Sequence, residues 1–352
     1  MQAHTGTAGH PDSPLVWEHL NSGYDEAVFR DVGFLNYTHG WTTGFIEQNG
    51  PDILIVLHTE NGGDTWTEQL EEYDQYVVDL EIVDDQTVWI TGKEKLFFTN
   101  NSDSDWFISE PASVQASYSL VEFFNQTHGW TATMETLYKT TDGGLTWSAV
   151  PGWDFEDDLP RYIEFIDDSR VLAIGWFGIY YSEDLAEAWE QVHDYGGWSL
   201  VALDNGKSLA VADNELMYSE DYTTWINLPV PNRAPLPRHT PPYLSDIFFL
   251  DDTHGWIVGD QIPIMYTPDG GNTWYEQSVS EEVTGRLMSV DFTNQTHGWA
   301  VGSEGIILRT TQGNLLECRL WMGITDPVFL IIVSSIGVIV IVGLGYYRRR
   351  KT

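Results

Sequence analysis

Two short motifs recur along the chain, and their spacing limits the folds it can adopt. The first, Thr-His-Gly-Trp, is intact at Thr38–Trp41, Thr127–Trp130, Thr253–Trp256 and Thr296–Trp299. The second, Thr-x-Asp/Asn-Gly-Gly-x-Thr-Trp and hereafter the box, is intact at Thr59–Trp66, Thr140–Trp147 and Thr267–Trp274. With weaker copies, the boxes begin at Thr59, Thr99, Thr140, Ser182, Ser219, Thr267 and Thr310. Units of about 40 residues have the size of four-stranded blades, so we expect an all-β, seven-bladed β-propeller.

Apolar side chains occupy fixed columns in these repeats. One column precedes the first motif and a second lies two residues further on, so both face the same side of one strand. The first column is Val32, Leu80, Val121, Ile163, Leu200, Ile247 and Val290. The second is Phe34, Ile82, Phe123, Phe165, Ala202, Phe249 and Phe292, and the motif adds Trp41, Trp89, Trp130, Leu172, Leu209, Trp256 and Trp299. We expect all three columns to form the core between blades.

The box has the composition of a structural turn. Its glycines permit left-handed backbone angles, its Asp or Asn can accept backbone N–H bonds, and its Trp can pack under the blade. The residues concerned are Asn61, Asp142, Asp184, Asp221 and Asp269, with Trp66, Trp106, Trp147, Trp189, Trp225 and Trp274. One carboxylate per turn gives too few oxygen ligands for Ca²⁺. The repeated His39, His128, His254 and His297 belong to separate blades, so we expect neither a metal nor a cofactor.

The last repeat is truncated, because it lacks both its box Trp and its outer strand. The segment Leu15–Leu20 resembles that missing strand. We therefore predict that the N-terminal strand closes the last blade and that Trp17 takes the box-Trp position there. Closure of the ring would remove exposed sheet edges.

These repeats resemble those of Asp-box (bacterial neuraminidase repeat) propellers, and among them the photosystem II stability/assembly factor type. The copies from Phe123 to Trp147 and from Phe292 to Thr311 are most similar to that pattern, and the similarity covers roughly residues 15–316. The resemblance implies a propeller fold and, by analogy with photosynthetic relatives, a membrane-associated assembly helper. The motif residues build blades, so the resemblance specifies the fold more than the function.

Sialidases and some glycosidases share the box. A sialidase needs an arginine triad and an Arg-Ile-Pro segment, but only eight arginines precede residue 322 and Arg-Ile-Pro is absent. We therefore expect a non-catalytic, monomeric module that binds a protein or a basic peptide. A cell-surface glycoside hydrolase of the Asp-box type is the alternative, because that chemistry needs only two suitably spaced carboxylates.

The formal charge of −37 limits the partners. Such a surface repels nucleic acid over roughly a Debye length, about 8–10 Å at ordinary salt, so nucleic acid is not an expected partner. The acidity is explained either by solvation in a salty environment or by attraction of cations or a basic partner.

A C-terminal segment has the length and composition of a membrane span. Residues 328–347 carry no charge, and a helix of about 1.5 Å per residue would cross a hydrocarbon layer of roughly 30 Å. The sequence after it, Arg348–Lys351, is basic and typical of the cytoplasmic side. No signal peptide is visible, so a tail-anchored propeller in the cytoplasm is the alternative to the extracytoplasmic one that we favour. The predicted division is residues 1–14 disordered, 15–316 propeller, 317–327 juxtamembrane linker, 328–347 transmembrane helix and 348–352 cytoplasmic tail.

Two regions are candidates for partner binding. In a four-stranded blade the second turn and the blade-to-blade connection share one face, called the top face here, while the first turn and the box share the bottom face. Six second turns carry an acid, at Glu47, Glu94, Glu135, Asp213, Asp260 and Glu304, whereas the fourth carries Phe177. We expect either an acidic rim that recruits basic segments or ordinary acidic turns. The proline-rich loop 227–243 holds Arg233, Arg238 and His239, and is either a docking strip or a rigid linker.

Overall fold

The computed structural model describes most of the repeat region and two short segments near the C-terminus. The described residues are 17–101, 105–111, 117–133, 136–150, 158, 160–212, 215–228, 243–279, 283, 285–313, 330–334 and 337–341.

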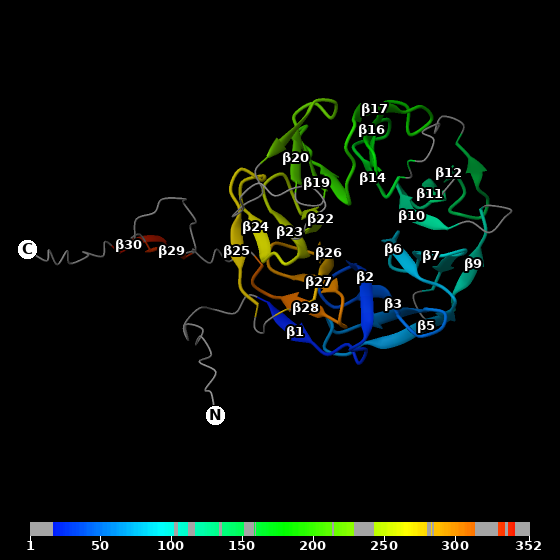
Figure 1. Ribbon diagram of the computed structural model, residues 1–352, viewed down its shortest axis with the longest axis horizontal. Coiled ribbons are helices and arrows are strands. Elements are labelled where there is room, and N and C mark those ends of the chain that lie inside the picture. The colour runs from blue at the N-terminus through cyan, green and yellow to red at the C-terminus, as the bar shows by residue number, and fades with distance from the viewer. Residues whose placement is uncertain are drawn as a thin grey trace, which may run out of the picture.

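Within these residues, seven antiparallel four-stranded sheets surround a central axis, as the sequence predicts (Figure 1). Blades 1 to 3 comprise β2 (Ala27–Phe34), β3 (Gly40–Ile46), β4 (Ile53–Thr59) and β5 (Thr67–Tyr73); β6 (Val77–Ile82), β7 (Val88–Gly92), β8 (Leu96–Thr99) and β9 (Phe107–Ser109); β10 (Tyr118–Phe123), β11 (Gly129–Thr133), β12 (Leu137–Thr140) and β13 (Ser148–Ala149). Blades 4 to 6 comprise β14 (Tyr162–Phe165), β15 (Val171–Ile174), β16 (Ile179–Ser182) and β17 (Glu190–His193); β18 (Ser199–Ala202), β19 (Ser208–Ala212), β20 (Glu215–Ser219) and β21 (Trp225–Leu228); β22 (Tyr243–Phe249), β23 (Gly255–Asp260), β24 (Ile264–Thr267) and β25 (Tyr275–Gln277).

The seventh blade joins the two ends of the repeat region. It contains β26 (Leu287–Phe292), β27 (Gly298–Gly302), β28 (Ile307–Thr310) and, as its outer strand, β1 (Glu18–Leu20). Trp17 is fully buried and lies edge-on to Phe292, with ring centroids 5.6 Å apart. Trp66 lies in the same way against Phe34 in the first blade. The N-terminal strand therefore closes the ring, and Trp17 stands where a box Trp stands in other blades.

The Gly-Trp pair of the first motif has a packing origin. Gly40 pairs across the sheet with Phe34, and a Cβ at Gly40 would lie 2.3 Å from the Phe34 ring. The glycine thus makes room for the aromatic ring on the neighbouring strand. The following Trp41 is 1% exposed and packs between its own blade and the next. This arrangement explains why the motif and the Phe column occur together.

The first and third boxes also contact the preceding blade. Gly144 of the third box has φ +81°, and a Cβ there would lie 2.3 Å from the ring of Trp89 in the second blade. The carbonyl of Gly62 in the first box accepts a 2.9 Å bond from Nε1 of Trp299 in the last blade. Within that box, Asn61 Oδ1 accepts the Thr65 amide at 2.9 Å. The box therefore fixes both its own turn and a junction between blades.

The fourth box keeps this geometry without glycine. Leu185 and Ala186 adopt φ of 55° and 67° at the two glycine positions. Ala186 donates its amide to Ser182 Oγ, and Ala188 donates to Asp184 Oδ1 at 2.8 Å. Because non-glycine residues resist these angles, tertiary packing maintains the turn at this position.

The predicted C-terminal helix is not confirmed. Among the described residues, none forms a helix long and apolar enough to cross a membrane. The described parts of the expected span form strands β29 (Leu330–Ser334) and β30 (Gly337–Ile341), paired as an antiparallel hairpin. A run of Ile and Val fits a strand as well as an apolar helix, because hydrophobicity and length alone do not distinguish the two. The remainder of 328–347 lies outside the described residues, as do residues 1–14, the linker and the basic tail.

Candidate functional site

A cavity of about 520 Å³ lies on the propeller axis, lined by the innermost strands of the blades. β-bulges shape its wall near the top face. In β2 a bulge inserts Arg30 between the paired residues Phe29 and Asp31, and both Arg30 and Asp31 line the cavity. Equivalent irregularities occur in β6, β10, β22 and β26. A bulge redirects a side chain, so these strands present an additional residue to the axis.

Three arginines line the cavity near the top face. Arg30, Arg161 and Arg286 all line the end of the cavity where the innermost strands begin, and we call this group the arginine mouth. The Arg161 guanidinium lies 3.9 Å from the ring centroid of Trp176 and 3.6 Å from that of Trp198. The Nε atom of Arg286 donates a 2.9 Å bond to Ser245 Oγ. The mouth is therefore a cationic group supported by aromatic rings and a neighbouring blade.

Arg30 is partly buried at the mouth. Burial lowers the pKa of Arg30, and the like charge of Arg286 lowers it further. Among the described residues, none accepts a hydrogen bond from the buried Nε of Arg30. A buried donor of this kind is costly to leave without a partner.

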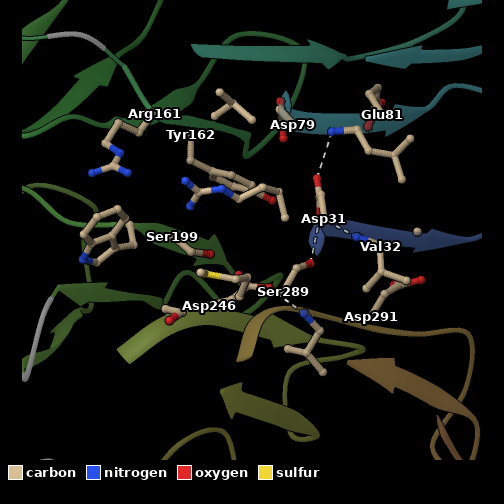
Figure 2. Close-up of a pocket in the computed structure, with 18 of the residues that line it drawn as sticks. Asp31, Val32, Asp79, Glu81, Arg161, Tyr162, Ser199, Asp246, Ser289 and Asp291 are labelled. Carbon is tan, nitrogen blue, oxygen red and sulfur yellow. Dashed lines mark hydrogen bonds between the residues drawn. The ribbon is translucent and has the colours of Figure 1, made fainter. Parts of the chain in front are cut away.

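Below the mouth, carboxylates form two tiers along the cavity wall (Figure 2). In the upper tier, Asp31 accepts the Leu80 amide at 2.9 Å and Asp79 accepts the Val121 amide at 2.7 Å, each from the next blade. Asp246 does the same with Val290 at 2.9 Å.

The lower tier has the same type of hydrogen bond, from a carboxylate to an amide of the adjacent blade, further along the innermost strands. Asp291 accepts the Phe34 amide at 2.7 Å, and Glu164 accepts the Ala202 amide at 3.4 Å. Innermost strands have an unpaired edge toward the axis, and these carboxylates satisfy part of it. Both tiers thus connect adjacent blades around the ring.

Burial alters the protonation of these groups. Burial, together with the nearby Asp246 charge, raises the pKa of Asp31 to about 6. Burial raises the pKa of Glu164 and Asp291 to about 7 and that of Glu81 to about 8. Several cavity carboxyls therefore hold protons near neutral pH, and the cavity is less negative than the formal charge of −37 implies.

The predicted acidic rim lies apart from this cavity. Glu47 and Glu304 are exposed, while Glu94 and Asp260 are partly buried, and none of the four lines the cavity. Glu135 and Asp213 lie outside the described residues, as do Arg233, Arg238 and His239 of the proposed docking loop. The box side chains of Asn61, Asp142, Asp184, Asp221 and Asp269 accept hydrogen bonds within their own turns.

Sequence reasoning missed the arginine mouth and the carboxylate tiers. The tiers had a signal, because acids alternate with the first apolar column, as in Asp79-Leu80-Glu81 and Val290-Asp291-Phe292. The mouth had a weaker signal, because Arg30 and Arg161 each lie two residues before the first apolar column, whereas Arg286 lies four residues before it and the other repeats have no arginine at either position. Only closure of the ring brings them together.

Comparison with known proteins supports the same architecture. A family model described as "Photosynthesis system II assembly factor YCF48" matches residues 231–323. The photosystem II assembly lipoprotein Ycf48 of Picosynechococcus is 24% identical over 302 residues, covering 76% of this chain and 79% of the relative. Its counterpart in Prochlorococcus marinus is 48% identical over 48 residues, covering 13% of this chain and 14% of the relative.

Solved structures show the same fold. A structure titled "YCF48 bound to D1 peptide" has a TM-score of 0.69 at 18% identity, covering 85% of this chain and 98% of that one. Virginiamycin B lyase from Staphylococcus aureus has a TM-score of 0.66 at 12% identity and covers 84% of this chain, so the architecture also serves an enzyme. The chain is an Asp-box β-propeller that resembles the photosystem II assembly factor repeat family.

Proposed function

We propose that this chain is a non-catalytic binding module that holds a peptide segment of a protein partner at the arginine mouth. The observation that carries the proposal is the convergence of three guanidinium groups at one end of a cavity, one of them with a buried Nε donor that no described residue satisfies. Guanidinium groups bind carboxylates through paired, charge-assisted hydrogen bonds, which are stronger than neutral ones.

The charge pattern of the top face suggests the kind of segment that fits. A positive mouth lies inside the proposed rim of Glu47, Glu94, Asp260 and Glu304, so a segment with an anionic tip and basic residues behind it complements both zones. The net charge of the protein does not oppose this, because at physiological salt a charge is felt over about 8 Å. Contacts at the mouth therefore contribute more to binding of the anionic tip than the net charge of the protein does.

The relatives support an assembly role. Curated relatives are named as photosystem II assembly proteins, and the structural relative is described as bound to a D1 peptide. For this chain we infer the corresponding general role, in which the propeller holds a segment of a membrane-protein subunit during assembly. We further propose that residues 328–347 attach it to the membrane, with the propeller outside and residues 348–352 in the cytoplasm. The lipoprotein names of the relatives agree with a membrane-associated site of action.

The glycoside hydrolase alternative has less support. Its two catalytic carboxylates need different environments, one poised as an acid and the other ionised. The cavity carboxylates Asp31, Asp79, Asp246 and Asp291 instead accept amides from adjacent blades, which accounts for their positions without catalysis.

A peptide titration tests the proposal. The probe is a fluorescein-labelled peptide with two lysines, a Gly-Ser spacer and the end Phe-Asp-Glu with a free carboxylate. The control peptide is identical except that Asn and Gln replace Asp and Glu and the C-terminus is amidated. We expect Arg30→Gln and Arg286→Gln each to weaken binding of the acidic peptide about tenfold or more. Arg170→Gln is the control, because Arg170 pairs with Asp167 in a bottom-face turn. Equal affinity for both peptides, or no effect of the mouth variants, would overturn the proposal.

A further inference from the structure

The fourth blade breaks the pattern of the top face. Six second turns carry an acid, but this one reads Gly175-Trp176-Phe177-Gly178. The Trp176 side chain is 52% exposed and that of Phe177 is 61% exposed. Exposed pairs of large aromatic residues are uncommon on a soluble surface, and beside a binding cavity they mark contact sites.

This turn is held rigidly by groups from both sides. Asp158 is 3% exposed and accepts the amides of Trp176 at 2.6 Å and Phe177 at 2.9 Å, together with the Tyr180 hydroxyl. The carbonyl of Gly175 accepts the Gly197 amide at 2.9 Å. A Cβ at Gly175 would lie 2.5 Å from Asp158, so the glycine allows this close approach. The two aromatic side chains are therefore presented on a fixed backbone.

The turn also adjoins the arginine mouth. The Arg161 guanidinium lies over the Trp176 ring and also over the Trp198 ring, with centroid distances of 3.9 Å and 3.6 Å. The two indole rings meet at 66° with centroids 5.5 Å apart. Trp176 thus has one face on the cation while about half of its surface remains in contact with solvent. An apolar surface and a cationic site lie directly side by side.

We propose that Trp176 and Phe177 form an apolar subsite that takes a large aromatic or aliphatic side chain of the peptide, next to the anionic group held by the arginines. This inference rests on the proposed function and specifies which side chain of the peptide is selected. The occupant follows from complementarity: guanidinium groups select an anionic tip, and the adjoining rings select an apolar neighbour. Asp158 is a positioning residue, because it fixes the turn without lying in the subsite. A prebuilt turn lowers the ordering cost of binding.

The test varies one residue of the same probe. Peptides ending X-Asp-Glu, with X as Phe, Leu or Ala, are titrated into the intact protein. The wild type should prefer Phe or Leu over Ala about tenfold, because a half-covered apolar side chain contributes on that scale. In Trp176→Ala/Phe177→Ala this preference should fall to within about twofold, with affinity for the Ala peptide little changed. Leu145→Ala, a variant of an 81% exposed side chain in a bottom-face box, should behave as wild type.

Two further variants separate the subsite from the proposed function. Arg286→Gln should weaken all three peptides by a similar factor and keep the preference for Phe. Asp158→Ala should reduce the preference, whereas Asp158→Asn, which keeps one acceptor oxygen, should retain part of it. Equal wild-type binding of the three peptides, with Arg286→Gln still weakening all of them, would overturn the subsite and leave the proposed function standing. Failure of every peptide to bind would overturn both.

Discussion

Truncation of Trp17 to alanine should weaken the whole propeller, because this side chain joins the two ends of the repeat region. Trp17 is 0% exposed, and loss of a buried Trp costs about 3–5 kcal/mol. Part of that loss is the edge-on contact with Phe292 at 5.6 Å, worth about 1 kcal/mol. Another part is the 2.8 Å bond from Nε1 to Gln277 Oε1, also about 1 kcal/mol. We therefore expect the free energy of unfolding to fall by about 4 kcal/mol.

The assay is urea unfolding followed by far-ultraviolet circular dichroism, which does not depend on the altered tryptophan fluorescence. Trp17→Phe keeps an aromatic ring, so it should lose about half as much and remains measurable if the alanine variant does not fold. Glu18→Gln is the control, because Glu18 is exposed and Arg309 keeps Asp64 as a partner, so the loss should be less than about 1 kcal/mol. A loss below about 1 kcal/mol for Trp17→Ala, with an unchanged m-value, would refute the closure argument.

Further predictions concern the box, the cavity and the rim. Gly144→Ala should lower the free energy of unfolding by about 2 kcal/mol or more, because the new Cβ strains the backbone and overlaps Trp89. Gly50→Ala is the control and should change this free energy little, because a Cβ at Gly50 meets open space. Urea unfolding measures both variants. Burial raises the pKa of cavity carboxyls to between about 6 and about 8, so the folded state binds more protons than the unfolded state. The melting temperature should therefore fall as pH rises from about 5 to about 8. A flat or rising profile of melting temperature against pH would contradict this. Replacing rim residues Glu94, Glu135, Asp260 and Glu304 with Gln should weaken binding of the lysine-bearing probe more at low than at high salt, and an unchanged titration would remove the rim from the site.

The fold could be predicted because the same pattern recurs in each blade, so a clear copy in one repeat identifies a weaker copy in another. The columns containing Val32, Phe34 and Trp41 recur in the repeats, and the first motif and the box mark turns with specific backbone needs. Even the weak fourth box, with Leu185 and Ala186 in place of glycines, was located by spacing alone. The truncated last repeat then required a strand from elsewhere, and β1 supplies it.

The arginine mouth could not be predicted by the same means, because its arginines occur in only three of the seven repeats. Arg30 lies at a β-bulge and Arg161 contacts two indole rings, and neither feature has a sequence signature. The acidic turns suggest a basic partner, whereas the cavity mouth carries three arginines. Phe177 was noted as the exception among those turns, but its proximity to Trp176 and Arg161 only emerges from the three-dimensional arrangement.

Site-specific cross-linking tests the central claim that a partner binds at the top-face mouth. A photoreactive benzoylphenylalanine is placed at Phe177 or, as the control, at the 81% exposed Leu145 on the bottom face, in intact cells of the source organism. The account predicts a discrete protein adduct from the Phe177 position that is lost when Arg286→Gln is added, and no such adduct from Leu145. An adduct from Leu145 alone, or one from Phe177 that persists in Arg286→Gln, would contradict it.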